Sequence, residues 1–359
     1  MIQATRISRW HVRFGKAALL CALLLVAGCL SYPPARPVKA SDDVSTLYAP
    51  HFDGEEYYNP WAKFVPSFKR RLQFMLTANP YPRRAPDVPR VDNDGAYLQR
   101  DDISDSLTWI GHSTTAIQER GQVVLTDPHL RQRIFAVGRH HPPAIGAHGI
   151  PANAMTVISH AHLDHLDAGT VEQLPDTVFY AVPLGLKTWF EKRGRANVVE
   201  LDWWQSHTRE GWTFTCLPAQ HWSQRVEMGF NKSLWCSWLI EGPRRTYFFA
   251  GDTGYFHGFA EFGRRFADID IAILPIGAYE PRDFIGYQHM DPQHAYRAYG
   301  DLKARYFVPV HWGTFRLSHE PIDEPPAELR RHLQLLQEAG DDVRFMAIGE
   351  RWILPSPLR

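Results

Sequence analysis

The stretch that most constrains the fold is Met155-Thr156-Val157-Ile158, followed directly by Ser159-His160-Ala161-His162-Leu163-Asp164-His165-Leu166-Asp167. The first run is apolar and β-branched and predicts a buried strand. The second run places three imidazoles and two carboxylates at the end of that strand. His-x-His on an extended loop directs two side chains to one side, and Asp-His two residues later serves a second point nearby, as in a two-metal centre. A histidine-rich surface loop is the alternative, but this spacing after a strand favours a metal site.

The composition fits one large globular unit. The chain has 359 residues, of which 44% are apolar and 13% aromatic, so it can bury a large core. Its formal net charge is zero. Four of its 39 basic residues and none of its 39 acidic residues precede Cys29, so the remainder carries a net charge of −4. A general nucleic-acid binder would show a basic excess, so no nucleic-acid partner is expected.

Residues 1–28 are predicted to be a lipoprotein signal peptide. A basic segment precedes the apolar run 17–27, which is shorter than the roughly 20 residues that a spanning helix requires. Val26-Ala27-Gly28-Cys29 resembles a bacterial lipobox, and by resemblance to sorted lipoproteins Leu30 favours the outer membrane. We therefore expect a protein of the bacterial cell envelope, lipid-anchored at Cys29 in the outer membrane and facing the periplasm. An uncleaved membrane anchor is the alternative.

The mature chain is predicted to begin with a flexible tether over residues 29–59, because this segment is rich in Pro, Ser and Asp. Residues 60–359 are expected to form one domain, with a helical or irregular extension over about 60–100. Within it, residues 61–76 carry apolar side chains at roughly helical spacing with basic residues between them, although Pro66 interrupts any single helix. This stretch suits packing on the domain, which we favour, or contact with a membrane surface.

The rest of the sequence alternates between apolar runs and polar or small residues, which is typical of an α/β protein. A polar residue follows the end of each apolar run, so the loops that carry these residues are expected to lie at one edge of a sheet. Helices are predicted over about 183–192, 292–304 and 326–339. Strands are predicted over 107–110, 115–117, 123–125, 155–158, 179–182, 198–201, 214–217, 235–240, 246–250, 271–274, 306–310, 343–346 and 352–354.

Three further candidate ligands follow later strands: His221, Asp252 and His311. Each of these histidines alone would more often be a core residue bonded to backbone. Beside the first cluster they bring the candidate ligands to seven, which exceeds the four of one tetrahedral zinc and suits two ions sharing a carboxylate. A single structural zinc is disfavoured because it normally recruits cysteines. Cys216 and Cys236 lack zinc-knuckle spacing, and either a disulfide or two inert buried thiols is expected.

Several longer blocks of the sequence resemble the metallo-β-lactamase superfamily and, within it, the N-acyl-phosphatidylethanolamine-hydrolysing phospholipases D. The ligand cluster is specific only to the superfamily, whereas the blocks at 202–204 and 276–282 point to the phospholipase branch. The matching blocks are Trp109-Ile110-Gly111-His112, Leu125-Thr126-Asp127-Pro128, the cluster 159–167, Val182-Pro183-Leu184-Gly185-Leu186, Glu200-Leu201-Asp202-Trp203-Trp204, Gln220-His221-Trp222, Phe249-Ala250-Gly251-Asp252-Thr253-Gly254-Tyr255, Pro275-Ile276-Gly277-Ala278-Tyr279-Glu280-Pro281-Arg282, Tyr287-Gln288-His289-Met290-Asp291-Pro292 and His311-Trp312-Gly313-Thr314-Phe315.

The resemblance implies an αββα sandwich of the metallo-β-lactamase type: two β-sheets flanked by helices, with the metals at the sheet edge and residues 60–359 as the hydrolase domain. It also implies the division of the ligands between two zinc ions. His160, His162 and His221 would hold one Zn²⁺. Asp164, His165 and His311 would hold the other, and Asp252 would bridge the two.

The implied reaction is the hydrolysis of N-acyl-phosphatidylethanolamine to N-acylethanolamine and phosphatidic acid. A hydroxide shared by the two zinc ions would attack the phosphorus. His289 is implied near the phosphate, where it would donate a hydrogen bond or a proton to the leaving oxygen. His289 and the ligand Asp164 are therefore the candidate catalytic residues, although a histidine before Asp291-Pro292 also suits a helix start.

Other readings stay open at this point. The same fold and metals would serve a lactonase or a phosphodiesterase with another substrate. A non-catalytic envelope lipoprotein that binds metal or lipid would be expected to have lost a ligand, and all seven are present. The His/Asp set accepts zinc, iron or manganese. A phospholipid substrate and a membrane, reached through lipidated Cys29, are the expected partners, and a homodimer is left open.

Overall fold

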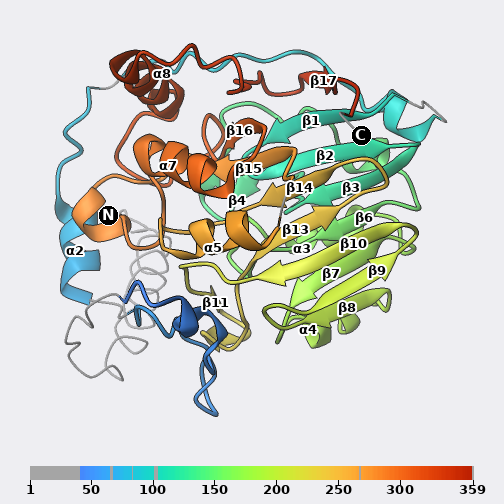
Figure 1. Cartoon of the computed structure of the whole chain (residues 1–359), viewed down its shortest axis with the longest axis horizontal. Coiled ribbons are helices and arrows are strands. Elements are labelled where there is room, and N and C mark those ends of the chain that lie inside the picture. Colours follow the sequence, from blue (N-terminus) through green and yellow to red (C-terminus); the bar gives the residue numbers. More distant parts are fainter. Residues whose placement is uncertain (1–40, 65–67, 83, 101–103, 267, 358–359) are drawn as a thin grey trace, which may run out of the picture. The chain divides into compact units, whose positions relative to one another are not determined.

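The computed structural model describes residues 41–64, 68–82, 84–100, 104–266 and 268–357 (Figure 1). The expected signal peptide and Cys29 lie outside these ranges. The contacts divide the chain into two compact units. One contains Lys39–Phe64 and Ala78–Arg359, and it carries both sheets and every candidate ligand. In the other unit, the described residues include helix α2 (Phe68–Leu76).

The first sheet has seven strands, and three of its neighbouring strand pairs are parallel. The neighbours β17, β1, β2 and β3 pair antiparallel, and β3, β6, β7 and β8 pair parallel, so β1, β3 and β6 run in the same direction. Their carboxyl ends therefore meet at one edge. In spatial order the strands are β17 (Arg351–Ile353), β1 (Ser106–Gly111), β2 (Thr114–Glu119), β3 (Gln122–Thr126), β6 (Met155–Val157), β7 (Phe179–Pro183) and β8 (Val198–Leu201).

The second sheet has six strands and repeats this arrangement. β14, β15 and β16 pair parallel, whereas β13 pairs antiparallel with both β14 and β10, so β10 runs with the parallel group. In spatial order the strands are β16 (Tyr306–Val310), β15 (Ile271–Pro275), β14 (Thr246–Phe249), β13 (Ser237–Glu241), β10 (Trp212–Leu217) and β9 (Ser206–Arg209). Two short hairpins complete the β structure: β4 (Arg133–Ile134) with β5 (Val137–Gly138), and β11 (Gln224–Arg225) with β12 (Gly229–Phe230).

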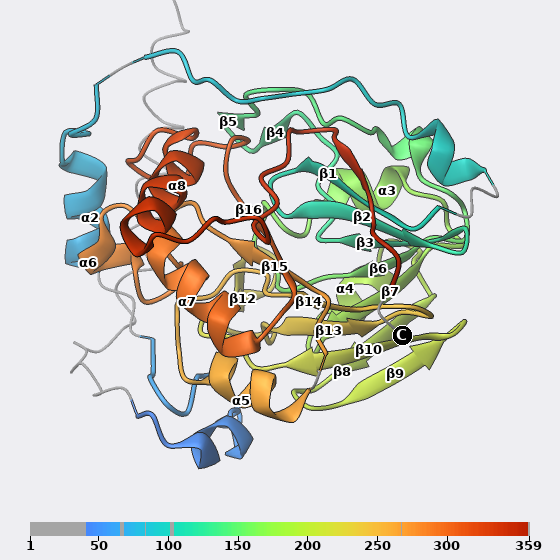
Figure 2. The ribbon, with the colours of Figure 1, turned by 45° about the horizontal axis from the view of Figure 1, so that its top comes forward.

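Helices cover the outer face of each sheet (Figure 2). Side chains of α3 and α4 join the apolar cluster on the first sheet, and side chains of α5, α7 and α8 join the cluster that contains the second sheet. These helices are α3 (Ala168–Gln173), α4 (Lys187–Glu191), α5 (Gly258–Arg265), α7 (Pro292–Leu302) and α8 (Glu324–Leu336), with the short α6 (Arg282–Ile285) before α7. The αββα sandwich inferred from the resemblance is confirmed.

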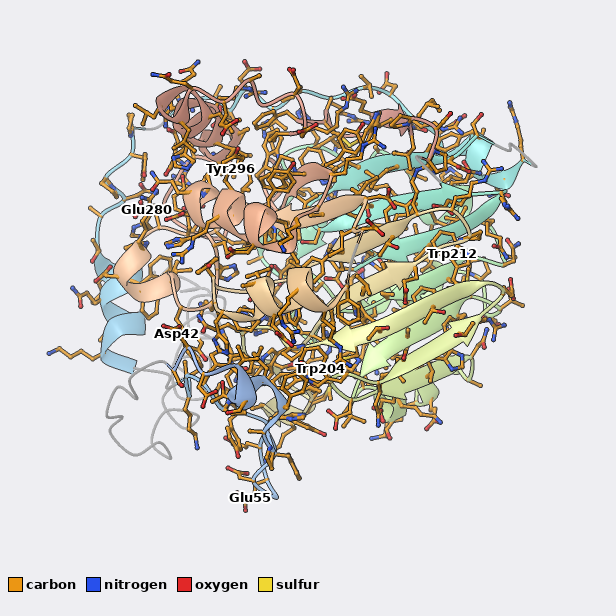
Figure 3. All side chains as sticks on the ribbon, viewed as in Figure 1. Asp42, Glu55, Trp204, Trp212, Glu280 and Tyr296 are labelled. Carbon is orange, nitrogen blue, oxygen red and sulfur yellow. The ribbon has the colours of Figure 1, made fainter. Side chains whose placement is uncertain are left out.

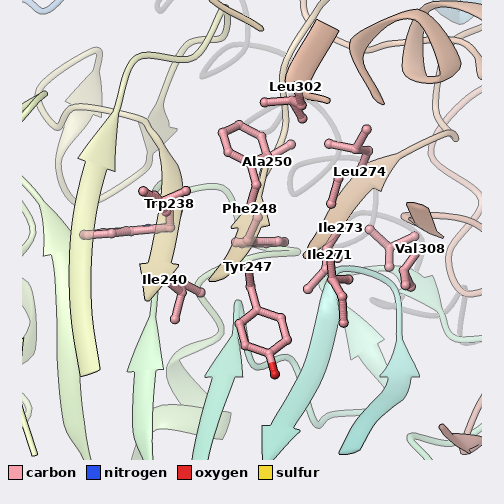
Figure 4. Close-up of a cluster of buried hydrophobic side chains, with 14 of the residues drawn as sticks. Trp238, Ile240, Tyr247, Phe248, Ala250, Ile271, Ile273, Leu274, Leu302 and Val308 are labelled. Carbon is pink, nitrogen blue, oxygen red and sulfur yellow. The ribbon is translucent and has the colours of Figure 1, made fainter. Parts of the chain in front are cut away.

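Strand periodicity explains the layers. In the first sheet, Trp109 and Val124 face the core between the sheets, whereas Ile110 and Leu125, one residue later, lie in the cluster with α3 and α4. In the second sheet, Tyr247 belongs to the buried cluster drawn in Figure 4. Its hydroxyl donates to Glu119 Oε1 of the first sheet at 2.6 Å. The next residue, Phe248, packs on Phe259 and Phe262 of α5.

The expected tether does not extend to residue 59. From Ser41 the chain is part of the large unit. The 3₁₀ helix η1 (Val44–Tyr48) buries Leu47 and stacks Tyr48 on Trp204, which is labelled in Figure 3. Asn59 is 1% exposed, and its amide donates to the backbone oxygen of His221 at 3.0 Å. A composition rich in Pro, Ser and Asp indicated flexibility, but the partners of this segment come from distant residues that local composition does not reveal.

Several element boundaries also differ from expectation. Residue 183 ends β7 and the following helix begins only at Lys187, because Gly185 turns the chain with a φ of +91°. Among the described residues of 61–76, α2 is helical, whereas Trp61 is buried outside it and stacks on Phe256. The strand expected at 343–346 is reduced to one bridge between Val343 and Phe307.

Of the four cysteines, Cys216 and Cys236 lie among the described residues, and both are buried free thiols with no disulfide between them. Two other 3₁₀ helices, η2 (Ala96–Gln99) and η3 (Ala147–Gly149), lie in connecting segments. Among the described residues, no helix has the length and apolar character needed to cross a membrane.

Candidate metal centre

The candidate ligands follow the carboxyl ends of strands that run in the same direction within each sheet. His160, His162, Asp164 and His165 follow β6 in the first sheet, as a loop that leads to α3. His221 follows β10, Asp252 follows β14 and His311 follows β16 in the second sheet. The structure brings all seven predicted ligands together at the edge shared by the two sheets.

Three imidazoles form a first group. His162 Nδ1 lies 2.8 Å from His160 Nε2 and 3.2 Å from His221 Nε2. His160 and His221 are almost completely buried, at 1% and 0% exposed, and His162 is partly buried. Because one ring nitrogen from each of the three residues lies within 4.8 Å of the others, this group has the form of a cation site.

A second group combines imidazoles with a carboxylate. Asp164 Oδ2 lies 3.3 Å from His165 Nε2 and 3.7 Å from His311 Nε2. It also lies 3.0 Å from Nε2 of His112, a residue outside the predicted ligand set. One donor atom from each of the four residues falls within 4.8 Å of the others.

Asp252 stands between the two groups. Its Oδ1 lies 3.2 Å from His311 Nε2, and its Oδ2 lies 3.1 Å from His165 Nε2. The same Oδ2 is 4.0 Å from both His160 Nε2 and His221 Nε2. Asp252 therefore faces both groups, and the bridging role that the resemblance implied for it stays a prediction.

The donor atoms fit two divalent cations. Metal–nitrogen and metal–oxygen bonds of about 2.0 to 2.2 Å place neighbouring ligand atoms about 3 to 3.5 Å apart. Within each group, most of the short separations given above fall in or near this range. Both ring nitrogens of buried His311, together with His165 Nε2 and Asp252 Oδ1, have no hydrogen-bond partner. Orphaned buried donors and acceptors are rare unless something else satisfies them, as a cation would here.

Neighbouring groups hold the ligand rings in place. His165 Nδ1 donates to Asp127 Oδ2 at 2.7 Å, and Asp127 accepts two further hydrogen bonds from Ser159. His221 Nδ1 donates to the backbone oxygen of Gln288 at 2.9 Å. These bonds leave Nε2 of both ligand rings directed at the centre, as is usual for histidines that bind metals.

The electrostatics favour the forms that bind cations. Burial lowers the pKa of His162 to about 4 and lowers the pKa of His160 and His221 well below the usual value, so these rings are neutral at pH 7. Burial alone would raise the pKa of Asp164, but the facing His165 lowers it well below its usual range. Asp164 is therefore ionised.

His165 shows the opposite shift from the first group. Burial alone would lower its pKa, but Asp252 and Asp164 outweigh burial and raise the pKa well above the usual value. The pKa of Asp252 is lowered well below its usual range, since His165 and His311 outweigh burial. A divalent cation would displace the proton from His165, because metal binding and proton release are linked.

His289 lies at the same centre. It is 12% exposed, and its Nδ1 is 3.8 Å from Asp252 Oδ2, with no hydrogen-bond partner. Its ring contacts the rings of His221 and His311 at centroid distances of 5.3 and 5.6 Å. Burial lowers the pKa of His289 to about 4. The structure thus places the candidate catalytic histidine beside the ligands.

Two residues of the centre were absent from the predicted site. His112 follows β1, and Asp127 follows β3, so both obey the strand-end rule that selected the other ligands. In the sequence, both appear only within the blocks that resemble the superfamily. Applying the rule to every strand end, rather than to histidine-rich ones, would have found them.

Comparison with known proteins gives the centre a family. Residues 122–312 match the β-lactamase superfamily domain. An uncharacterised protein of Mycobacterium tuberculosis is 38% identical over 268 residues, covering 70% of this chain and 68% of that protein. N-acyl-phosphatidylethanolamine-hydrolyzing phospholipase D 1 of Caenorhabditis elegans is 34% identical over 265 residues, covering 68% of this chain and 74% of that protein.

Solved structures agree on the fold. An isothiocyanate hydrolase from Delia radicum gut bacteria superposes with a TM-score of 0.57 at 21% identity, covering 70% of this chain and 99% of that one. The family match spans more than half of the chain, and its residues include all seven candidate ligands. The chain therefore belongs to the metallo-β-lactamase superfamily, as a metal-dependent hydrolase similar to the N-acyl-phosphatidylethanolamine-hydrolysing phospholipases D.

Proposed function

We propose that the protein is a two-metal phosphodiesterase that hydrolyses N-acyl-phosphatidylethanolamine to N-acylethanolamine and phosphatidic acid. The observation that carries the proposal is the position of Asp252, whose two oxygens lie 3.1 and 3.2 Å from His165 and His311 while facing the first group at 4.0 Å. Such a shared carboxylate suits a pair of cations rather than one. Two cations, zinc in our proposal, would lower the pKa of a shared water and balance the charge that develops on a phosphate.

The choice of substrate is supported by the relatives. The Caenorhabditis elegans protein, named for its action on N-acyl-phosphatidylethanolamine, is similar over 74% of its length. The similarity covers 68% of this chain. The same bond in the same class of lipid is therefore our first choice.

His289 is proposed to act on the leaving group. Its ring lies against His221 and His311, and its Nδ1 has no hydrogen-bond partner among the described residues. With a pKa of about 4, the ring is neutral at pH 7 and carries one N–H. That N–H is available to donate a hydrogen bond to a phosphate oxygen or to the leaving oxygen.

An aromatic band beside the first group supplies apolar surface for a lipid chain. Trp222 packs edge-on against His162 at 4.4 Å between centroids and stacks on Phe64 at 5.4 Å. Phe230 and Tyr287 extend the band on either side. Trp222 and Phe64 are only partly buried, so the band is open to an apolar partner. Most other tryptophans, including Trp203, Trp235 and Trp312, are ordinary core residues, with exposures of 4%, 1% and 4%.

The proposal is tested with purified protein on vesicles of N-acyl-phosphatidylethanolamine, phosphatidylcholine and phosphatidylglycerol, with and without chelator. Release of the headgroup is measured for each lipid. We expect it only from the first lipid, as N-acylethanolamine, and expect its loss on chelation and in His162→Ala. Exposed His148 lies outside the centre, so His148→Ala is the control. Chelator-insensitive release, or full activity in His162→Ala, would overturn the proposal, and a preference for another headgroup would reassign the substrate.

We also propose that the chain is lipidated at Cys29 and held at the outer membrane, next to its substrate. Support comes from the lipobox-like sequence alone, because Cys29 lies outside the described residues. The test is incorporation of a labelled fatty acid into the wild type and into Cys29→Ala, followed by separation of the inner and outer membranes. Equal labelling of both proteins would contradict lipidation at this cysteine, and recovery of the labelled protein in the inner membrane would contradict the location.

A further inference from the structure

We propose that His112 is a protein ligand of the second cation, alongside Asp164, His165 and His311. This inference rests on the two-metal centre of the proposed function but not on the phosphodiesterase reaction or its substrate. It gives the second cation five protein donors when Asp252 is included, against four for the first: His160, His162, His221 and the shared Asp252.

The distances place His112 among the ligands. Its Nε2 lies 3.0 Å from Asp164 Oδ2, closer than the nitrogens of His165 and His311, which lie 3.3 and 3.7 Å from the same oxygen. Its ring lies 4.1 Å from the ring of His311 and 5.3 Å from the ring of His165, between centroids. A cation bound by Asp164 Oδ2 and the other two imidazoles would therefore lie within reach of His112 Nε2.

The backbone at His112 is held in an unfavourable conformation. Its φ is +55°, a region that residues other than glycine seldom occupy. It follows Gly111, with a φ of +125°, where the register of β1 against β2 shifts. A residue with a side chain pays a conformational cost here, and such costs are concentrated at functional positions.

Three hydrogen bonds hold this conformation. The His112 amide donates to Thr314 Oγ1 at 2.7 Å, and its carbonyl accepts from Trp109 Nε1 at 2.8 Å. The same carbonyl accepts from the His311 amide at 3.1 Å. His311, a predicted ligand, itself has a φ of +63°, so two residues in the left-handed conformation are joined backbone to backbone. This arrangement fixes the directions of both rings relative to each other.

The burial of the His112 ring limits the roles that it can have. The residue is 2% exposed, and its ring packs edge-on against Phe315 at 5.2 Å. The alternative role is that of a hydrogen-bond donor that orients Asp164 without touching the cation. The two roles differ in whether Nε2 carries a proton or binds metal, and that difference is measurable.

The experiment uses the full chain loaded with Co²⁺ and containing ¹⁵N-labelled histidine. In the proton NMR spectrum, each histidine bound to Co²⁺ gives a strongly shifted, exchangeable ring N–H signal. We expect one such signal from each of His112, His160, His162, His165, His221 and His311, and the loss of one of them in His112→Asn. This readout needs no substrate, so a failure of the phosphodiesterase assignment leaves it unaffected.

Metal affinity provides the second measurement. In His112→Ala, competition with a chelator should show that one of the two Co²⁺ ions is bound more weakly by about 100-fold or more, beyond the roughly 10- to 100-fold cost of losing an outer hydrogen-bond partner. The other ion should be bound as in the wild type. His140→Ala, at an exposed histidine outside the centre, is the matched control.

Two results would overturn the inference. The first is unchanged affinity for both ions in His112→Ala. The second is weakened affinity with the same set of shifted N–H signals in wild type and His112→Asn, which would make His112 a positioning residue for Asp164. If a variant fails to fold, the wild-type spectrum still decides, because one ring signal fewer than expected would exclude His112 as a ligand.

Discussion

The two ligand groups of the centre are built differently. The first consists of three imidazoles that burial keeps neutral, supported through His221 by a backbone oxygen. The second contains an ionised carboxylate, Asp164, and a histidine, His165, that is anchored by a second carboxylate, Asp127. The first group thus provides neutral nitrogen donors, and the second adds negative charge. If each group binds one cation, as we propose, the two cations would be held by different kinds of ligand and should be separable by substitution.

Substitution of Asp252 is expected to have the largest effect on the two ligand groups. Because its oxygens face both groups, Asp252→Asn removes charge from both sites while keeping the side-chain shape. We expect both cations to be bound at least about 100-fold more weakly, above the usual cost of an outer partner, with loss of hydrolysis. Metal content after dialysis and chelator competition measure this. Retention of two tightly bound ions would show that Asp252 is not shared.

Single ligand substitutions should separate the groups. His162→Ala is expected to remove the first cation and leave the second, whereas Asp164→Asn should weaken the second and leave the first. Hydrolysis should be lost in both, because the reaction needs both cations. Metal analysis of the two purified variants side by side is the measurement. If each variant lost both ions, the two groups would have to be regarded as one cooperative site.

Asp127 tests how the hydrogen bond to His165 affects metal binding by the second group only. Asp127→Asn retains a side chain of the same shape but no longer offers a carboxylate to His165 Nδ1. We expect the second cation to be bound about 10- to 100-fold more weakly, the range typical of such outer partners. The first cation should be unaffected. Equal weakening of both ions would contradict the separation of the groups.

Trp222 tests the aromatic surroundings of the first ligand group. Removing its ring in Trp222→Ala takes away contacts with His162 and Phe64, worth about 0.5 to 1.5 kcal/mol per aromatic pair. We expect KM for the lipid to rise by up to about tenfold while metal content stays at two ions. Trp204→Ala, distant in its contacts from the ligands, is the control. A rise in KM of the same size in the control would remove Trp222 from substrate binding.

His129 tests whether burial also keeps a histidine outside the ligand set neutral. It is completely buried, and burial lowers its pKa from 6.5 to about 4. The unfolded chain therefore takes up a proton as the pH falls below 6.5, whereas the folded chain does not until about pH 4, so this residue costs stability over that window. In the presence of chelator, the free energy of unfolding should fall between pH 7 and pH 5 in both proteins. The fall should be about 2 kcal/mol smaller in His129→Gln than in wild type. Identical pH dependence in urea denaturation would contradict the burial effect, with His148→Gln as the exposed control.

The loop at 159–167 was predictable because its information is local. A strand followed by His-x-His-x-Asp-His places four donors within a few residues, whatever the rest of the chain does. The strand-end rule also recovered His221, Asp252 and His311, since parallel strands bring their carboxyl ends to one edge. The layers followed from residues that alternate between two apolar clusters, as Trp109 and Ile110 do.

Other features depended on distant partners. Residues 41–59 looked like a tether, yet Asn59 supports His221 from 162 positions away, a contact that composition cannot signal. Cys216 and Cys236 stay reduced in the core, although their spacing and compartment left a disulfide open.

The sequence by itself determined the kind of centre, because ligand types and their spacing along one loop are properties of the covalent chain. Only the tertiary structure decided how those ligands are shared between two groups, since this depends on where strands from both sheets end in space. It also decided that His112, a single histidine in a turn, faces Asp164: its ring direction is set by a left-handed backbone locked to His311 and Thr314, about two hundred residues further along.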